Sequence, residues 1–356
     1  MRKTVIITSP SLDTKENVSG VSSVVNFIIN SNKDYSYIHF LIGKRDNESG
    51  NAFIRIFKLL GRFFGWIRLL RQEKDAILHY SYPLEMKSIV RDWLFMSYAH
   101  LRNRQMLIHV HGGLYLTRKE RPWFVSKILS QVFSWGHPIV VLSADEKKML
   151  EEQFYARNIT VLPNCISLDV AKEQRKTFVG KRHLHLLYLG RIEKNKGIDY
   201  IIEACQILRS EGVQYTLHVA GKEQEPYLQM IEAKLGDSFI YEGIVSGQEK
   251  DDLLKLCDVF VLPSFYEGLP VSLIECMSFG MIPICTNVGS ISSVVEHDEN
   301  GYLVPLFDSY SIAEAIKEIY YDNMKSEELS ANAKQMIFDN FSPEKYVSAL
   351  NVLYAI

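Results

Sequence analysis

Two glutamates, Glu267 and Glu275, lie eight positions apart where an apolar strand gives way to a helix. Val259–Leu262 reads as a buried parallel strand, Pro270 suits the first position of the helix, and Gly280 suits the position just past its end. Open α/β sheets bind ligands at the carboxyl ends of their strands, where the free N–H groups of a helix start favour a phosphate. Carboxylates beside that point accept hydrogen bonds from hydroxyls. The pattern therefore predicts a site for a sugar nucleotide.

Two cations follow another candidate strand, residues 184–189, which ends in a glycine turn before a helix with an apolar side. An arginine forks onto phosphate oxygens, and a lysine supplies a point charge. Arg191 and Lys196 are therefore candidate clamps for a diphosphate leaving group. The alternative is that both are solvated residues at an exposed turn.

The spacing Glu267-x7-Glu275 and the run from Gly190-Arg191 to Lys196-Gly197 resemble two signatures of the retaining GT-B glycosyltransferases called family 4, or glycosyl transferases group 1. The resemblance is to members that build bacterial surface polysaccharides. It implies that Glu267 holds donor-sugar hydroxyls, that Glu275 holds the ribose, and that the two cations grip the diphosphate. The nucleotide-binding set that it implies is completed by Gly268 and Leu269.

The first half of the chain adds two candidates. A strand at 4–8 precedes a helix that opens at Gly20, where the missing Cβ lets the backbone approach a phosphate, although an ordinary turn glycine is the alternative. A strand at 106–111 runs into a double glycine and places His111 at its carboxyl edge. A neutral imidazole there could bond a donor-sugar hydroxyl or shield charge at the anomeric carbon, and the alternative is a satisfied strand-end histidine. The resemblance favours the catalytic role, while His109 is predicted to be core.

Length and periodicity predict an α/β chain with two domains. The resemblance implies the GT-B arrangement, in which two Rossmann-like doubly wound domains face a cleft. We predict an acceptor-side domain at 1–165, a nucleotide-sugar domain at 183–340, and a C-terminal helix at 341–356 that crosses back to the first domain. The polar stretch 163–182 is the predicted boundary. Strands are predicted at 4–8, 36–42, 76–82, 106–111, 139–143 and 159–162, then at 184–189, 215–220, 239–241, 259–262, 281–285 and 302–304.

Composition excludes several classes of protein. The 356 residues are 47% hydrophobic and 23% charged, as in ordinary globular chains, and no run approaches the roughly 20 apolar residues of a membrane span. The N-terminus lacks a signal-peptide pattern, and the five cysteines show no paired metal spacing, which favours a reducing cytoplasm. Residues 1–180 hold 26 Lys and Arg against 16 Asp and Glu, whereas residues 181–356 hold 14 against 26. The basic half suits an anionic acceptor or membrane surface, and we expect no nucleic-acid partner.

Part of the positive charge of the first half lies in residues 54–71. On a helix, Arg55, Lys58, Arg62 and Arg68 share one arc, and most of the aromatic and aliphatic residues lie opposite. Such a helix is typical of an interfacial anchor, which would place the protein peripherally on the inner face of the plasma membrane. The alternative is a helix whose apolar side covers the first sheet.

The resemblance implies a hexosyl-type transferase, EC 2.4, that moves a sugar from a UDP or GDP donor to a lipid-linked or oligosaccharide acceptor with retention of anomeric configuration. It assigns catalysis to Glu267, His111, Arg191 and Lys196. No Asp-x-Asp pair follows a strand, so we expect no essential metal and no cofactor. The alternatives are a sugar-nucleotide epimerase or other GT-B enzyme, and a non-catalytic glycan-binding module.

Overall fold

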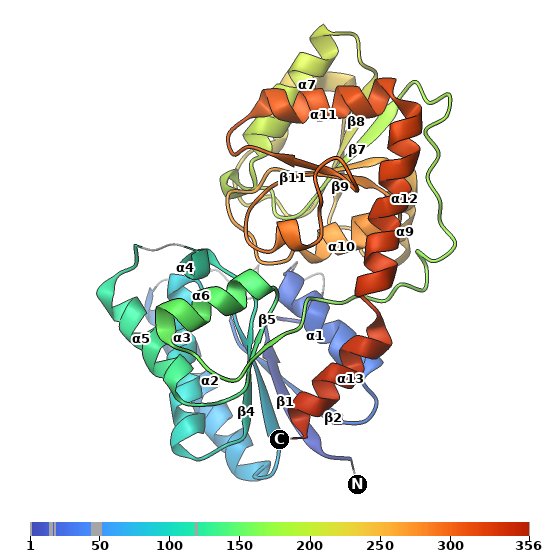
Figure 1. The fold of residues 1–356 in the computed structure, drawn as a ribbon. Helices are drawn as coiled ribbons and strands as arrows, with labels where there is room; N and C mark the ends of the chain where they lie inside the picture. Colours follow the sequence, from blue (N-terminus) through green and yellow to red (C-terminus); the bar gives the residue numbers. More distant parts are fainter. Residues whose placement is uncertain (1, 14–16, 18, 44–51, 118–119, 356) are drawn as a thin grey trace. The chain divides into compact units, whose positions relative to one another are not determined.

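The computed structural model describes residues 2–13, 17, 19–43, 52–117 and 120–355, and it divides the chain into two units (Figure 1). Unit 1 combines Met1–Asn164 with Pro343–Ile356, and unit 2 is Cys165–Ser342. Each unit contains a parallel sheet of six strands with helices on both faces. The predicted fold class, α/β with two Rossmann-like doubly wound sheets, is confirmed.

Unit 1 is built on the strand order β2-β1-β3-β4-β5-β6. Its strands are β1 (Thr4–Ser9), β2 (Ser36–Leu41), β3 (Ile77–Tyr82), β4 (Met106–Val110), β5 (Ile139–Val141) and β6 (Ile159–Val161), and its helices are α1 (Gly20–Ser31), α2 (Ala52–Gln72), α3 (Met86–Leu101), α4 (Leu114–Thr117), α5 (Trp123–Ser134), α6 (Ala144–Phe154) and α13 (Pro343–Tyr354). The central strands β3 and β4 are buried along their whole length, as near-continuous apolar runs require in a sheet covered on both faces.

Unit 2 has the strand order β12-β11-β10-β7-β8-β9. Its strands are β7 (Leu184–Leu189), β8 (Tyr215–Ala220), β9 (Phe239–Gly243), β10 (Val259–Leu262), β11 (Ile282–Thr286) and β12 (Tyr302–Val304), and its helices are α7 (Ile198–Ser210), α8 (Leu228–Leu235), α9 (Gly247–Leu256), α10 (Val271–Ser278), α11 (Ser309–Tyr321) and α12 (Asn323–Asn340), with 3₁₀ turns η1 (Lys194–Lys196), η2 (Gly236–Ser238) and η3 (Ile291–Ser293). All twelve predicted strands are present in the two units: four have the predicted bounds, and the ends of the others differ by at most two residues.

The order of strands in unit 2 locates the point at which open α/β sheets bind ligands. The first strand of the unit, β7, pairs with β8 on one side and with β10 on the other, so the winding reverses between β7 and β10. Loops that leave the carboxyl ends of two such strands diverge to opposite faces and leave a crevice between them. The corresponding reversal in unit 1 lies between β1 and β3.

The stretch between the two sheets belongs structurally to unit 2. The backbone N–H groups of Phe178 and Val179 donate to the Glu327 carboxylate, and the Phe178 side chain is fully buried. From Cys165 on, the stretch that lacks apolar periodicity is a segment of turns and irregular backbone that belongs to unit 2. Near the end of the chain, α13 begins at Pro343, two residues after the predicted start at 341, because proline suits the first turn of a helix, and it lies beside α1 in unit 1 (Figure 1).

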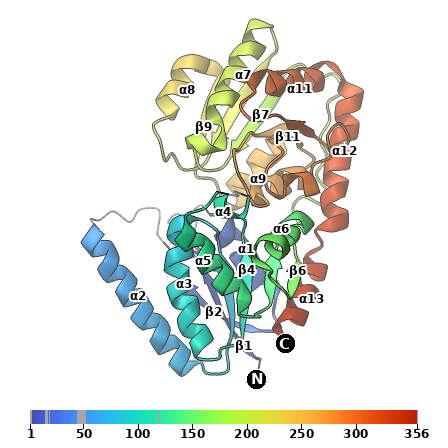
Figure 2. The ribbon, with the colours of Figure 1, turned by 60° about the vertical axis from the view of Figure 1, so that its left-hand side comes forward.

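Helix α2 packs on unit 1 with only part of its length. Trp66 and Leu70, in its second half, are buried against α3 and the sheet, whereas Phe57 and Phe64 are 72% and 67% exposed. Figure 2 shows that α2 diverges from α3 toward its N-terminal end. The residues of α2 that pack on the core run from Leu59 to Leu70, and Phe57 and Phe64 are not among them. The side chain of Arg55 lies outside the described residues, and among the described residues no helix is long and apolar enough to span a membrane.

Candidate active site

Lys196 and Glu267 meet at the point where the winding of unit 2 reverses. Lys196 ends η1 after β7, and Glu267 lies in the loop after β10. The Nζ atom of Lys196 donates to Oε1 of Glu267 over 2.6 Å, and their side chains are 15% and 11% exposed. A charge-assisted bond of this length, largely shielded from water, holds both side chains in fixed positions. The sequence-predicted cation and acid therefore form one site.

Backbone contacts fix the two loops against each other. Gly197 has φ of 73°, and a Cβ on it would lie 2.1 Å from the carbonyl oxygen of Pro263. Only glycine allows this approach, so Gly197 brings η1 against the end of β10. The amide of Phe265 also donates to the carbonyl of Asn195 over 2.9 Å. The Lys196 and Glu267 loops are thus joined directly on both sides of the ion pair.

A third loop, which follows β11, packs on the backbone of Glu267. Gly289, after β11, has φ of 59°, and a Cβ there would lie 2.2 Å from the carbonyl oxygen of Glu267. The next amide, from Ser290, donates to the carbonyl of Gly268 over 3.0 Å. Leu269 follows with its side chain buried. The loop around Gly289 therefore fixes the backbone of the glutamate turn and of both neighbouring residues in the predicted nucleotide set.

Arg191 is the more exposed of the two cations. Its guanidinium Nη2 lies 3.6 Å from Oε1 of Glu193, and its side chain is 44% exposed. The hydroxyl of buried Tyr188 donates to the carbonyl of Arg191 and fixes the backbone there. Burial raises the pKa of Tyr188 well above its ordinary value, and the charges of Glu267 and Glu193 add to that rise. Tyr188 thus lies near both the Arg191 turn and Glu267, and the Arg191 side chain beside them remains partly exposed to solvent.

Glu275 has a different partner from Glu267. It lies in α10 and accepts from Nζ of Lys250, in α9, over 2.6 Å, with side-chain exposures of 16% and 26%. Desolvation is the largest single effect on the pKa of Lys250 and lowers it, but the charge and hydrogen bond of Glu275, with smaller contributions from nearby groups, together raise the pKa above its ordinary value. The helix that carries Glu275 was predicted to begin at Pro270. It begins one residue later, at Val271, and Pro270 is its N-cap. The first amides of α10 follow the glutamate turn and have no partner within the helix, as at any helix start.

The unit 1 candidates lie at the carboxyl edge of the other sheet. His111 directly follows β4, and Gly113, with φ of 125°, packs so closely on the backbone of Leu84 that a Cβ would lie 2.7 Å from it. Burial lowers the pKa of His111 to about 3, so its imidazole is neutral at physiological pH. His109 is fully buried, as predicted. Gly20 is the first residue of α1, which follows β1 at the edge where the winding reverses.

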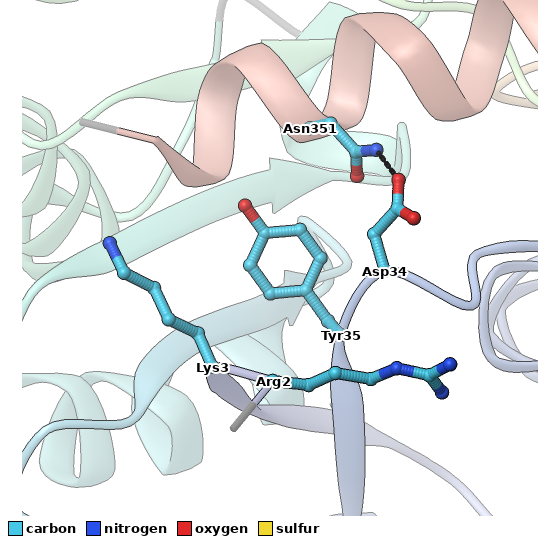
Figure 3. A pocket seen from close by; sticks show the side chains of 5 residues that line it. All are labelled: Arg2, Lys3, Asp34, Tyr35 and Asn351. Atoms are coloured by element: carbon cyan, nitrogen blue, oxygen red, sulfur yellow. Dashed lines mark hydrogen bonds between the residues drawn. The ribbon is translucent and has the colours of Figure 1, made fainter.

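A shallow polar hollow in unit 1 lies far from these residues along the strands. It is lined by Arg2, Lys3, Asp34, Tyr35 and Asn351, and the amide of Asn351 donates to Asp34 (Figure 3). These residues precede β1 and β2 or lie in α13. The hollow is therefore at the amino edge of the sheet, where α/β folds do not bind ligands, and it is not the candidate site.

The sequence did not indicate several residues that shape the site. Tyr188, Glu193, Lys250 and Gly289 act through contacts that depend on the strand order. Only Gly289 had a sequence signal, because a glycine after a strand often marks a close approach of backbones. Among the residues that the structure describes, no three His, Cys, Asp or Glu side chains are grouped as a metal ion would require.

Comparison with known proteins places this geometry in context. Residues 169–336 match the family described as Glycosyl transferases group 1. A curated relative, the UDP-Gal:alpha-D-GlcNAc-diphosphoundecaprenol alpha-1,3-galactosyltransferase of Escherichia coli, is 23% identical over 326 residues, which cover 85% of this chain and 80% of the relative. The alignments with three other curated relatives span 41% to 67% of the relatives' own length.

Solved structures share the fold over the whole chain. Sucrose-phosphate synthase from Thermosynechococcus elongatus superposes with a TM-score of 0.81 at 18% identity and covers 99% of this chain and 98% of its own. HepE of Anabaena, in complex with UDP and glucose, superposes with a TM-score of 0.77 at 14% identity, and the match covers 100% of both chains. At these identities the likeness establishes the fold.

Proposed function

Starting from a chain whose residues 169–336 form a Glycosyl transferases group 1 domain, we propose that this protein is a retaining glycosyltransferase. It transfers a sugar from a UDP or GDP donor to a glycan acceptor carried on a lipid, in the synthesis of a surface polysaccharide. The observation that carries the proposal is the Lys196–Glu267 pair at the strand reversal of unit 2. The Escherichia coli relative, named for a UDP-Gal donor and a lipid-linked acceptor, supports both substrate classes.

The reaction requires a stabilised leaving group. Lys196 and Arg191 supply two positive charges to the departing nucleoside diphosphate, and the first amides of α10 supply hydrogen bonds. Together these groups perform the neutralisation that other enzymes assign to a divalent cation, so the proposed reaction needs no metal. Glu275 accepts hydrogen bonds from the ribose hydroxyls in addition to the one from Lys250.

Glu267 orients the donor sugar. In the structure its second carboxylate oxygen remains available beside the one that Lys196 occupies, and a carboxylate accepts several hydrogen bonds. It therefore holds sugar hydroxyls while the backbone of Gly268 and Leu269 borders the diphosphate. His111 meets the sugar as a neutral imidazole, whose bare nitrogen accepts a hydrogen bond from a sugar hydroxyl without adding positive charge near the anomeric carbon.

Retention of configuration follows if the acceptor attacks from the face that the diphosphate leaves. A diphosphate oxygen then takes the acceptor proton, and the bond from acceptor oxygen to anomeric carbon forms as the bond to the diphosphate breaks. This route needs no protein nucleophile, and Glu267 keeps its binding role throughout.

Access to a lipid-linked acceptor is supported by α2. Phe57, Leu60 and Phe64 follow helical spacing on one face and are 72%, 43% and 67% exposed. Lys58 and Arg68 lie on the same helix. An exposed apolar face with cations beside it suits an anionic lipid surface, which would hold the protein peripherally on the cytoplasmic face of the membrane.

A screen of nucleotide sugars tests the proposal. Each UDP- and GDP-sugar is incubated with the protein, with and without undecaprenyl-linked glycan acceptors, and diphosphate release is measured. We expect one donor to give acceptor-dependent release and an α-linked product, and Lys196→Met to abolish it. The matched control is Lys317→Met, which removes the cation of an exposed ion pair on α11. Acceptor-independent conversion of the donor to its epimer would identify an epimerase instead, and binding of glycans without any turnover would identify a binding module.

A further inference from the structure

Three histidines and a tyrosine form a continuous buried contact chain in unit 1. The Tyr354 hydroxyl, in the last turn of α13, lies 2.5 Å from Nδ1 of His79 on β3. The Nε2 atom of His79 lies 3.0 Å from Nδ1 of His109 on β4. The ring of His109 stacks on that of His111, with centroids 4.0 Å apart and planes 27° apart. The chain therefore connects the C-terminal helix to the candidate catalytic histidine.

Both inner histidines are neutral. His79 and His109 are fully buried, and burial is the largest cause that lowers the pKa of each, to about 3 for His79. A neutral imidazole has one N–H donor and one bare nitrogen acceptor. Each bond in the chain therefore has a direction, and the direction of the first bond fixes that of the second.

The tyrosine determines this direction. A phenol, with an ordinary pKa near 10, is a better donor than a neutral imidazole, and burial keeps Tyr354 protonated. Tyr354 therefore donates to Nδ1 of His79. The hydrogen of His79 is then on Nε2 and points to Nδ1 of His109, which leaves the hydrogen of His109 on its own Nε2. That atom is buried and has no hydrogen-bond partner among the described residues.

We propose that Tyr354 is a positioning residue that acts through His79 and His109 on His111. By donating its hydrogen it selects the Nε2–H tautomer of both buried histidines, and so fixes the ring on which His111 stacks. The catalytic consequence rests on the proposed function, in which His111 contacts the donor sugar. The tautomers themselves do not depend on that function.

The experiment uses the full chain labelled with ¹⁵N-histidine and compares it with Tyr354→Phe. Long-range ¹H–¹⁵N spectra at pH 7 distinguish the two tautomers of each ring, and His79→Gln and His109→Gln identify the signals. We expect single Nε2–H tautomers for His79 and His109 in the parent protein. In Tyr354→Phe we expect mixed tautomers for both rings and a shift of the His111 signals. Tyr346→Phe is the matched control, since it removes another buried hydroxyl from α13, and it should leave the histidine signals unchanged.

Kinetics with the donor found in the screen provide the second readout. Loss of one neutral hydrogen bond in the chain should lower kcat about fivefold with little change in KM for the donor, and Tyr346→Phe should retain parent activity. Parent-like histidine tautomers in Tyr354→Phe, or altered tautomers with an unchanged kcat, would overturn the proposal. If the parent protein turns over no donor, the proposed function fails, and the spectra still decide whether Tyr354 sets the tautomers.

Discussion

The Lys196–Glu267 pair predicts that removing the charge of Glu267 strengthens the binding of UDP. In the structure the Lys196 ammonium is bound to the Glu267 carboxylate over 2.6 Å. A nucleoside diphosphate that needs this ammonium has to compete with the carboxylate for it. Glu267→Gln removes the competing charge and keeps the size of the side chain. The variant should therefore bind free UDP more tightly than the parent protein while it loses turnover of the sugar nucleotide.

The magnitude follows from the geometry of the pair. A hydrogen bond to a charged partner contributes about 1.5 to 3 kcal/mol, and an uncharged amide retains part of it, so the relief on UDP binding is about 1 kcal/mol, or about fivefold. Lys196→Met instead removes the bond to the diphosphate. That change should cost about 2 kcal/mol, which weakens UDP binding about thirtyfold.

Isothermal titration of UDP into each variant measures both effects. Glu314→Gln is the matched control, because Glu314 accepts from Lys317 over the same 2.6 Å on the surface of α11. Its UDP affinity should equal that of the parent protein. If Glu267→Gln weakens UDP binding as much as Lys196→Met does, the carboxylate supports nucleotide binding and the competition argument is wrong.

Three further predictions concern the two units separately. Because burial lowers the pKa of His79 to about 3 while an unfolded histidine titrates near 6.5, the contribution of His79 to the stability of unit 1 is complete above pH 7, and about 2 kcal/mol of it is lost by pH 5. All four tryptophans lie in unit 1, so urea unfolding followed by their fluorescence should show a smaller loss in His79→Gln, and an equal loss would contradict the assigned burial effect. Replacing Phe57 and Phe64 by Ser should reduce cosedimentation with anionic vesicles at least tenfold and leave the unfolding midpoint unchanged, whereas undiminished binding would exclude α2 as the contact. Gly197→Ala should destabilise the protein by more than the roughly 1 kcal/mol expected for Gly212→Ala, which has a similar φ but open space around it, and equal unfolding midpoints would show that the contact with β10 is not tight.

Local sequence determined the elements of this protein and the loops that carry its chemistry. Twelve runs of strand length, separated by helical patterns and glycine turns, predicted all twelve strands. The signal was clearest for the central strands, because parallel strands buried on both faces consist of continuous apolar residues, whereas β2 and β9 lie at sheet edges and are partly exposed. The same patterns placed Lys196 and Glu267 in loops after strands, and they predicted the last helix to within two residues at each end.

Helix α2 shows where periodicity stops being informative. Its pattern has one apolar and one basic side along the whole helix, yet Trp66 is buried and Phe57 is 72% exposed. Periodicity defines a face of a helix, but it does not determine how much of that face a neighbouring element covers. That length depends on where α3 and the sheet end in space.

The site itself depended on tertiary structure. Lys196 and Glu267 are 71 residues apart in the sequence. They meet because β7 pairs with β10 as well as with β8, the next strand along the chain. Glu275 has an equally good acid side chain, but its position in α10 brings it to Lys250. Tyr354 reaches His79 across 275 residues because α13 packs on unit 1. Local propensities extend over a few residues and therefore specify elements, whereas the pairing of strands and helices that brings distant side chains within hydrogen-bond distance is decided by burial of the whole core.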